Sequence, residues 1–186
     1  MMQTAELAVL DWIQTHLRHP ILDPIIVFIT TLGNAGILWI GLTILLAVRK
    51  STRKTAAALA VALGLCLLWG NLLLKPLIGR IRPFNAQDAI TLLIAAPLDY
   101  SFPSGHTMSS FAAAMVLLLT ERRMGIPAMI LAGLIAFSRM YLYVHYPTDV
   151  LAGLLMGCLF GWFAVRIVQK LHAHRFQRNQ QEKPHR

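Results

Sequence analysis

The chain has 186 residues, of which 56% are hydrophobic and only 13% are charged. That is more apolar surface than a soluble domain of this length can bury, so the composition excludes an ordinary soluble protein and indicates an integral membrane protein of one domain. The net charge of +9 is divided among short clusters between apolar runs, which favours orientation in a bilayer over nucleic-acid binding.

Residues 4–18 carry apolar side chains at helical spacings of three and four: Leu7, Leu10, Ile13 and Leu17. Polar residues fill the opposite side, which predicts an amphipathic helix lying at the membrane interface. Acidic residues and histidines among the first 20 positions do not fit a cleavable signal peptide, so we expect the first apolar span to act as the membrane signal.

Apolar segments long enough to cross a bilayer follow at 25–48, 55–74, 103–121, 126–143 and 147–166. The first is interrupted at residues 33–36, which predicts a broken span or a short surface helix at its start. Within the loop at 83–102, residues 89–96 are apolar enough to dip into the interface. We therefore predict an all-α, polytopic transmembrane bundle in a single domain, residues 1–171, followed by a basic, partly disordered cytoplasmic tail, residues 172–186.

Five spans make the connecting segments alternate between two sides of the membrane, and the basic residues divide unevenly between them. Twelve of the 17 Lys and Arg lie on one side: Arg49, Lys50, Arg53, Lys54, Arg122, Arg123, Arg166, Lys170, Arg175, Arg178, Lys183 and Arg186. By the positive-inside rule this side is cytoplasmic. The ends of the spans that carry the other polar clusters then face outward.

Three polar clusters interrupt the apolar pattern, at residues 75–83, 102–106 and 138–149, and the topology brings them to the same side. Ionisable groups at membrane depth are costly unless they are paired or face water, so they mark function. Lys75, Arg82 and Arg139 would repel one another unless an anion lay between them, and arginine suits bidentate contact with phosphate. A phosphate-bearing substrate is therefore expected.

The remaining residues of the clusters suggest chemistry on that phosphate. Ser104 and Gly105 precede a helix whose free N–H groups favour an anion, and the Ser104 hydroxyl can add a contact. Asp149 follows His145 by four residues and can accept a hydrogen bond from its Nδ1–H, which leaves Nε2 as a nucleophile. His106 is then the general acid that protonates the departing oxygen.

Three segments together resemble the three-part signature of the type 2 phosphatidic acid phosphatase (PAP2) superfamily. They are Lys75-x6-Arg82-Pro83, Pro103-Ser-Gly-His106 and Ser138-Arg139-x5-His145-x3-Asp149. The resemblance implies a phosphohistidine formed on His145, oriented by Asp149, with His106 as the acid and Lys75, Arg82 and Arg139 holding the phosphoryl oxygens. It implies no metal and no cofactor. Many bacterial members have six spans, so we expect five to six.

The expected function is hydrolysis of a lipid phosphate or diphosphate at the outer face of a bacterial inner membrane, with undecaprenyl diphosphate as first choice. Phosphatidylglycerophosphate, phosphatidic acid and lipid A phosphates remain alternatives, because the headgroup contacts are expected from residues 84–102, which match no motif. There are two further alternatives. One is phosphoryl transfer from one lipid to another, and the other is a transporter that binds phosphate without chemistry. We expect no obligate protein partner, and we expect Arg18 and Arg80 to extend to lipid headgroups.

Overall fold

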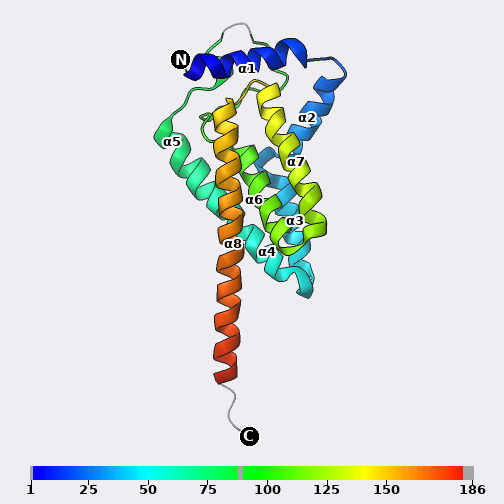
Figure 1. Ribbon diagram of the computed structural model, residues 1–186, viewed down its shortest axis with the longest axis vertical. Helices are drawn as coiled ribbons and strands as arrows, with labels where there is room; N and C mark the ends of the chain where they lie inside the picture. Colours follow the sequence, from blue (N-terminus) through cyan, green and yellow to red (C-terminus); the bar gives the residue numbers. More distant parts are fainter. Residues whose placement is uncertain (1, 88–89, 182–186) are drawn as a thin grey trace.

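The computed structural model describes residues 2–87 and 90–181, and in these ranges the protein is built from helices. The first helix, α1 (Met2–His16), lies across one end of a bundle formed by the others (Figure 1). Its apolar residues Leu10 and Ile13 are buried against that end. The amphipathic helix predicted at residues 4–18 is therefore present, and its apolar side faces the protein.

The first apolar segment is broken, as the sequence predicted. Helix α2 (Leu22–Leu32) and helix α3 (Ile37–Val48) are bent by 42° around a 3₁₀ turn at Asn34–Gly36. Ala35 and Gly36 both have positive φ, at 50° and 66°, which ends one helix and starts the next at a new angle. The turn lies at the depth of the polar clusters.

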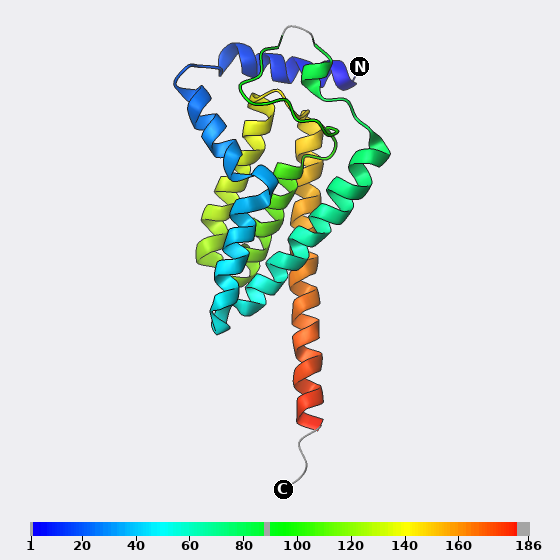
Figure 2. The same ribbon diagram turned by 180° about the vertical axis from the view of Figure 1, so that it is seen from behind.

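A continuous helical stretch then crosses the bundle obliquely (Figure 2). It consists of α4 (Arg53–Leu65), a π-helical segment (Cys66–Leu74) and the short α5 (Lys75–Ile78). Gly79 ends it in the left-handed conformation, with φ of 60°, and its N–H bonds to the carbonyl of Lys75. The stretch delivers Lys75 to the end of the bundle that α1 covers.

The loop after α5 contains a 3₁₀ turn at Pro83–Asn85 and passes close to α1 before it reaches α6 (Figure 1). Its apolar residues Ile90, Leu92 and Ile94 pack against the segment that joins the last two helices, around Tyr141 and Tyr143. The predicted apolar dip at 89–96 begins at residue 89, which lies outside the described residues. The rest of it contributes to the protein core.

The last three helices form the centre of the fold: α6 (Gly105–Thr120), α7 (Arg122–Tyr141) and α8 (Pro147–Gln181). Helix α6 packs against α4, α7 and α8, and small buried residues such as Ala112 and Ala113 let these neighbours approach. On α8, Gly153, Gly157 and Gly161 face the α6 backbone, where an added Cβ would come within 2.4–2.7 Å of a carbonyl oxygen.

The all-α prediction is confirmed, and the prediction of five to six spans is supported in part. Among the described residues three helical stretches are long and apolar enough to cross a membrane, Lys50–Asn85, Arg122–Tyr141 and Pro147–His174, and the bent pair α2 and α3 gives a fourth if it is one span. Helix α6 has 16 residues and rises only about 24 Å, less than the roughly 30 Å hydrocarbon core. It is enclosed by other helices, so it need not match the lipid.

The predicted tail is helical as far as the structure describes it. Helix α8 continues without a break from the bundle to Gln181, and residues 182–186 lie outside the described residues. The domain boundary at residue 171 stays a prediction, since no change of backbone structure marks it.

Candidate active site

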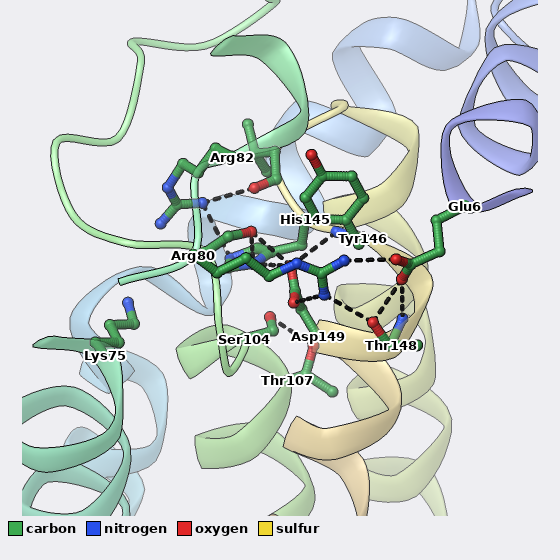
Figure 3. Close-up of polar contacts among 12 residues, drawn as sticks. Glu6, Lys75, Arg80, Arg82, Ser104, Thr107, His145, Tyr146, Thr148 and Asp149 are labelled. Carbon is green, nitrogen blue, oxygen red and sulfur yellow. Dashed lines mark hydrogen bonds and ion pairs between the residues drawn. The ribbon is translucent and has the colours of Figure 1, made fainter. Parts of the chain in front are cut away.

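The three polar clusters meet at the end of the bundle beneath α1, around a cavity of about 300 Å³. Six of the residues singled out in the sequence line this cavity: Lys75, Arg82, Gly105, His106, Arg139 and His145. Ser104 and Asp149 do not line it, but they lie next to each other and close to His145 (Figure 3). Segments separated by as many as 70 residues in the chain thus contribute to one site.

Two of the predicted cations share a carboxylate that the sequence motifs did not indicate. The two carboxylate oxygens of Asp99 bind Lys75 Nζ and Arg82 Nη2, the second at 2.5 Å, and the Asp99 carbonyl accepts a bond from Arg82 Nε at 2.7 Å. Burial would raise the pKa of the Asp99 carboxyl, but the hydrogen bond and charge of Lys75, with Arg82, outweigh it and hold the pKa at about 2. An anion therefore already lies between two of the cations.

Arg139, near the end of α7, presents the third cation to the cavity. Its side chain is 2% exposed, and Nη1 donates to the hydroxyl of Thr30 at 2.5 Å. Within the described ranges, Arg139 Nε is a buried donor without a hydrogen-bond partner. A buried charged donor left without a partner is costly, so this atom favours an anion with an accepting oxygen in the cavity.

His145 lies in the tight connection between α7 and α8, and its ring is nearly fully buried. Its Nε2 is 3.2 Å from Nη1 of Arg82, which also donates to the carbonyl of Val144 at 2.7 Å. Burial, together with the charges of Arg82 and Arg139, outweighs the contact with Asp149 and lowers the pKa of His145 to about 3. The imidazole is thus neutral, with Nε2 at the cavity, as a nucleophile must be.

The predicted link between His145 and Asp149 includes a third residue. Asp149 Oδ2 is 3.6 Å from His145 Nδ1, longer than a hydrogen bond, and accepts shorter bonds from Ser101 Oγ at 2.5 Å and the Tyr146 N–H at 2.9 Å. Ser101 Oγ also lies 3.4 Å from His145 Nδ1. Because the Ser101 hydroxyl donates to Asp149, its oxygen can accept from Nδ1–H and connect the two.

Arg80 does not extend to lipid headgroups, so that expectation was wrong. Its Nη1 binds Asp149 Oδ1 at 2.5 Å, and its Nη2 binds Glu6 Oε2 of helix α1 at 2.5 Å (Figure 3). The guanidinium carbon also lies 3.9 Å from the centre of the Tyr146 ring. The Asp149 carboxylate is fully buried, so pairing with this arginine offsets the cost of burying its charge.

His106 begins α6 and faces the break between α2 and α3. Its Nε2 lies 2.8 Å from Asn34 Oδ1, and its ring packs so close to Gly33 that an added Cβ there would be 2.8 Å from Cδ2. The sequence indicated an interruption at residues 33–36 but not that it would contact His106. Its ring lines the cavity, and a proton on Nε2, which can be donated to Asn34 Oδ1, is the proton that a general acid would give up there.

Ser104 and Gly105 occupy the start of α6. Ser104 Oγ accepts a bond from the Thr107 hydroxyl at 2.9 Å, and the Ser104 N–H donates to the carbonyl of Asp149 at 3.1 Å, so this serine ties α6 to α8. Gly105 lines the cavity, where an added Cβ would lie 3.0 Å from Asn71 Oδ1. The helix start thus offers backbone N–H groups to an anion.

A second cavity, of about 500 Å³, shares Lys75, Asp99, Gly105 and His106 with the first. From there it extends between the helices along an apolar wall, formed among others by Ile40, Leu63 and Leu67. The site therefore joins a polar end to an apolar groove within the bundle. This combination suits a molecule with a charged head and a hydrocarbon tail.

The sequence motifs missed Asp99, Ser101, Asn34, Arg80 and Glu6 as parts of the site. Asp99 and Glu6 did carry a signal, since acidic residues are few in this chain, with Asp and Glu together numbering eight. Their partners lie far away in sequence and could be identified only in the folded protein. In the described part of the chain, no group of three or more His, Cys, Asp and Glu is arranged to hold a metal ion.

Comparison with known proteins gives consistent results. The PAP2 superfamily matches residues 53–173. The chain is 37% identical over 147 residues to an undecaprenyl-diphosphatase of Sulfolobus acidocaldarius, covering 78% of this chain and 70% of the relative. It is 34% identical over 149 residues to the undecaprenyl-diphosphatase BcrC of Bacillus subtilis, covering 80% and 76%. A PAP2-type phosphatidylglycerolphosphate phosphatase structure from Bacillus subtilis superimposes with a TM-score of 0.73 at 26% identity, covering all of this chain and 89% of the other.

Proposed function

The chain belongs to the PAP2 superfamily and is a multi-pass membrane phosphatase acting on lipid phosphates, and from this premise we propose that it converts undecaprenyl diphosphate to undecaprenyl phosphate and inorganic phosphate. The two undecaprenyl-diphosphatases similar over more than three quarters of this chain support that substrate. The apolar groove beside the cationic cavity supports a long-chain lipid.

The terminal phosphate of the substrate enters the cavity and takes contacts from Lys75, Arg82 and Arg139. The unpaired Arg139 Nε donates to one phosphoryl oxygen, and the N–H groups at the start of α6 donate to another. To reach Lys75 and Arg82, the phosphate displaces or moves the Asp99 carboxylate. These contacts stabilise the negative charge that spreads over the equatorial oxygens in the transition state.

His145 Nε2 then attacks the terminal phosphorus, and the bond from phosphorus to the bridging oxygen breaks. Asp149 and Ser101 stabilise the positive charge that develops on the imidazole, through Nδ1. His106 gives its proton to the departing oxygen of undecaprenyl phosphate. Water then attacks the phosphohistidine, His106 takes up a proton from this water, and inorganic phosphate leaves.

The observation that carries this proposal is the cavity itself, which brings a neutral, buried histidine, a second histidine and three cations to one 300 Å³ space. A carrier that only bound phosphate would need the cations. It would not need two histidines that reach the same cavity from α6 and from the connection between α7 and α8. Family membership likewise favours the hydrolase over a transporter.

The direct test is phosphate release by the purified protein from a panel of lipids: undecaprenyl diphosphate, phosphatidylglycerophosphate, phosphatidic acid and lipid A. We expect the highest kcat/KM with undecaprenyl diphosphate. Preference for phosphatidylglycerophosphate would instead assign the function of the structurally similar Bacillus subtilis phosphatase. Phosphate recovered on a second lipid and not in solution would assign a phosphotransferase.

The two histidines should fail differently when they are replaced. His145→Ala should abolish turnover and any acid-labile phosphoenzyme, since the attacking nitrogen is gone. His106→Ala should slow turnover by about 10²–10⁴-fold for a panel lipid that releases an alkoxide, such as phosphatidic acid. The loss should be smaller for undecaprenyl diphosphate and p-nitrophenyl phosphate, whose leaving groups are less basic and need less protonation. A penalty independent of leaving-group pKa would remove His106 from the acid's role, and turnover by His145→Ala would exclude the covalent intermediate.

A further inference from the structure

Helix α1 holds the connection between α7 and α8, on which His145 lies, by a series of polar contacts. The Gln3 side chain donates to the Tyr146 hydroxyl at 3.1 Å, and the Tyr143 hydroxyl donates to Asp11 at 2.6 Å. Gln14 donates to the carbonyl of Tyr141 at 2.6 Å. The apolar side of α1 packs on the same segment through Leu10.

Glu6 is the member of this series that reaches the catalytic groups. Its carboxylate is 7% exposed, accepts bonds from the N–H of Thr148 at 3.1 Å and its hydroxyl at 2.5 Å, and pairs with Arg80. A buried carboxylate on an interfacial helix is costly unless it is paired with other groups of the protein. Glu6 also precedes residues 53–173, the part of the chain that matches the superfamily.

Arg80 connects the two carboxylates. One arm, Nη1, binds Asp149 and the Thr148 hydroxyl, at 2.5 and 2.7 Å, while the other arm, Nη2, binds Glu6 (Figure 3). The guanidinium is planar, so a partner on one arm fixes the direction of the other. Three alternating charges, on Glu6, Arg80 and Asp149, thus lead from the surface helix to the neutral nucleophile His145.

The charges in this row decide what Glu6 contributes. Arg80 alone would draw electron density of the Asp149 carboxylate toward Oδ1 and away from Oδ2, the oxygen nearest His145. The Glu6 carboxylate, on the far side of the guanidinium, offsets much of the positive charge of Arg80. The effect is strong because the pair of Glu6 and Arg80 is poorly exposed to water. Asp149 can then act on the imidazole as a nearly full negative charge.

We propose that Glu6 and Arg80 are positioning residues for the phosphoryl-transfer step, with Glu6 acting through Arg80 to orient Asp149 and keep its charge available to His145. This rests on the proposed function, in which His145 is the nucleophile. Neither residue touches the cavity that holds the phosphate. Their loss should therefore change the rate of phosphorylation of His145 and not the binding of substrate.

Glu6→Gln keeps the shape of the side chain and removes its charge. We expect kcat to fall by about 10- to 100-fold, as for loss of a charge-assisted hydrogen bond, with KM within about twofold of wild type. Asp11→Asn is the matched control, because it weakens another acid-mediated contact between α1 and the same connection without reaching Asp149. This control should retain kcat within about threefold.

The cycle of Glu6→Gln, Arg80→Gln and the double variant separates positioning from simple docking of α1. If Glu6 acts through Arg80, the double variant has the kcat of Arg80→Gln alone, whereas independent structural roles make the two losses multiply. For Asp11→Asn combined with Arg80→Gln, we expect a loss of kcat equal to the product of the two single losses. Thermal unfolding of each variant in detergent checks that it is folded, and Glu6→Asp, which keeps the charge, should recover part of the lost kcat.

The substrate is the panel lipid that the wild type hydrolyses fastest, and His145→Ala is assayed beside the variants. Three results would overturn the positioning role while leaving the hydrolase intact. One is a raised KM with unchanged kcat in Glu6→Gln, and another is an equal loss of kcat in Glu6→Gln and Asp11→Asn. The third is a double variant of Glu6→Gln and Arg80→Gln whose loss of kcat is the product of the two single losses. Full turnover by His145→Ala, or no hydrolysis of any panel lipid, would overturn the proposed function and this inference with it.

Discussion

Asp99 shows how a single side chain changes the electrostatics of this site. Lys75, Arg82 and Arg139 place three positive charges around the cavity, and the Asp99 carboxylate pairs with the first two. Its pKa of about 2, below the usual 3.8, keeps it ionised at every pH at which a membrane protein is assayed. The positive charge of the cavity is therefore partly neutralised by an internal anion, which would compete with a phosphate for Lys75 and Arg82.

Replacing Asp99 by Asn should strengthen the binding of phosphate-like anions. We expect the inhibition constant of vanadate, which resembles the phosphoryl-transfer transition state, to fall by about three- to tenfold, since the competing charge is removed and the cations remain. The ratio of the vanadate inhibition constant of the variant to that of the wild type should stay constant from pH 5 to 9, because Asp99 is ionised throughout that range. Asp23→Asn, which removes an acid 3.9 Å from Arg18 outside the cavity, is the control. Weaker vanadate inhibition would instead mean that Asp99 mainly holds Lys75 and Arg82 in place.

The residues of the site were predictable from the sequence only where a short motif contained them. Lys75, Arg82, His106, Arg139 and His145 all line one cavity, as the motifs indicated. The partners that modify them were not predictable, because each bond joins distant segments and depends on the bend of a loop or the placement of α1. The pairing of Arg80 with Glu6, 74 residues away, is of this kind.

At the scale of elements, the contact between α6 and α8 determines where the two histidines proposed as catalytic lie. His106 lies on α6 and His145 in the connection that leads into α8. The two helices pack closely along the glycines of α8, and the N–H of Ser104 at the start of α6 donates to the carbonyl of Asp149 at 3.1 Å. A separation of even one ångström would carry His106 away from His145, and such a displacement can be costly for catalysis. The glycine face is thus part of the catalytic geometry.

Gly157→Ala tests this contact, because its Cβ would lie 2.4 Å from the carbonyl oxygen of Met108. We expect a loss of about 1–3 kcal/mol in the free energy of unfolding, as for an overpacked core, together with reduced kcat. Gly133→Ala on α7 is the matched control, since nothing lies within 4 Å of its added Cβ, and it should be neutral or slightly stabilising. Thermal unfolding in detergent measures both, and an equally stable Gly157→Ala would contradict the close approach.

Helix positions were largely predictable, since uncharged runs bounded by charge and by Gly or Pro become helices in a membrane. The π-helical segment at Cys66–Leu74 was not, because periodicity does not reveal one. Within it, Gly70 accommodates Met108, whose Cε would be 1.9 Å from an added Cβ. This depends on α6 and not on the local sequence. A span was predicted at residues 103–121, but the sequence did not indicate that α6 would be too short to cross the hydrocarbon core and would be buried, because its burial follows from its neighbours.

At the scale of the whole molecule, the cavity and the basic tail lie at opposite ends. Helix α8 carries Asp149 in its first turn and has 35 residues, which extend about 52 Å (Figure 1). We propose that the end carrying the tail is cytoplasmic, as the positive-inside rule predicts, so that the active site faces the exterior. This arrangement suits a substrate whose phosphate is exposed on the outer surface.

A pair of reporter fusions tests the orientation. Green fluorescent protein joined after residue 186 should fluoresce, and alkaline phosphatase at the same point should be inactive, because the former folds in the cytoplasm and the latter needs the periplasm. The opposite result would place the active site inside. Replacing the two arginines at residues 122 and 123, between α6 and α7, by Gln should weaken the preference, since they belong to the basic side.

The apolar groove that meets the cavity at Lys75 and His106 has a kinetic consequence. A lipid that keeps its tail among the helices while its head reacts is collected by lateral diffusion in two dimensions, and the water phase plays no part in the encounter. The quantity that saturates the enzyme is then the surface mole fraction of substrate. Diluting a fixed amount of substrate with inert detergent should slow turnover, although its bulk molarity is unchanged.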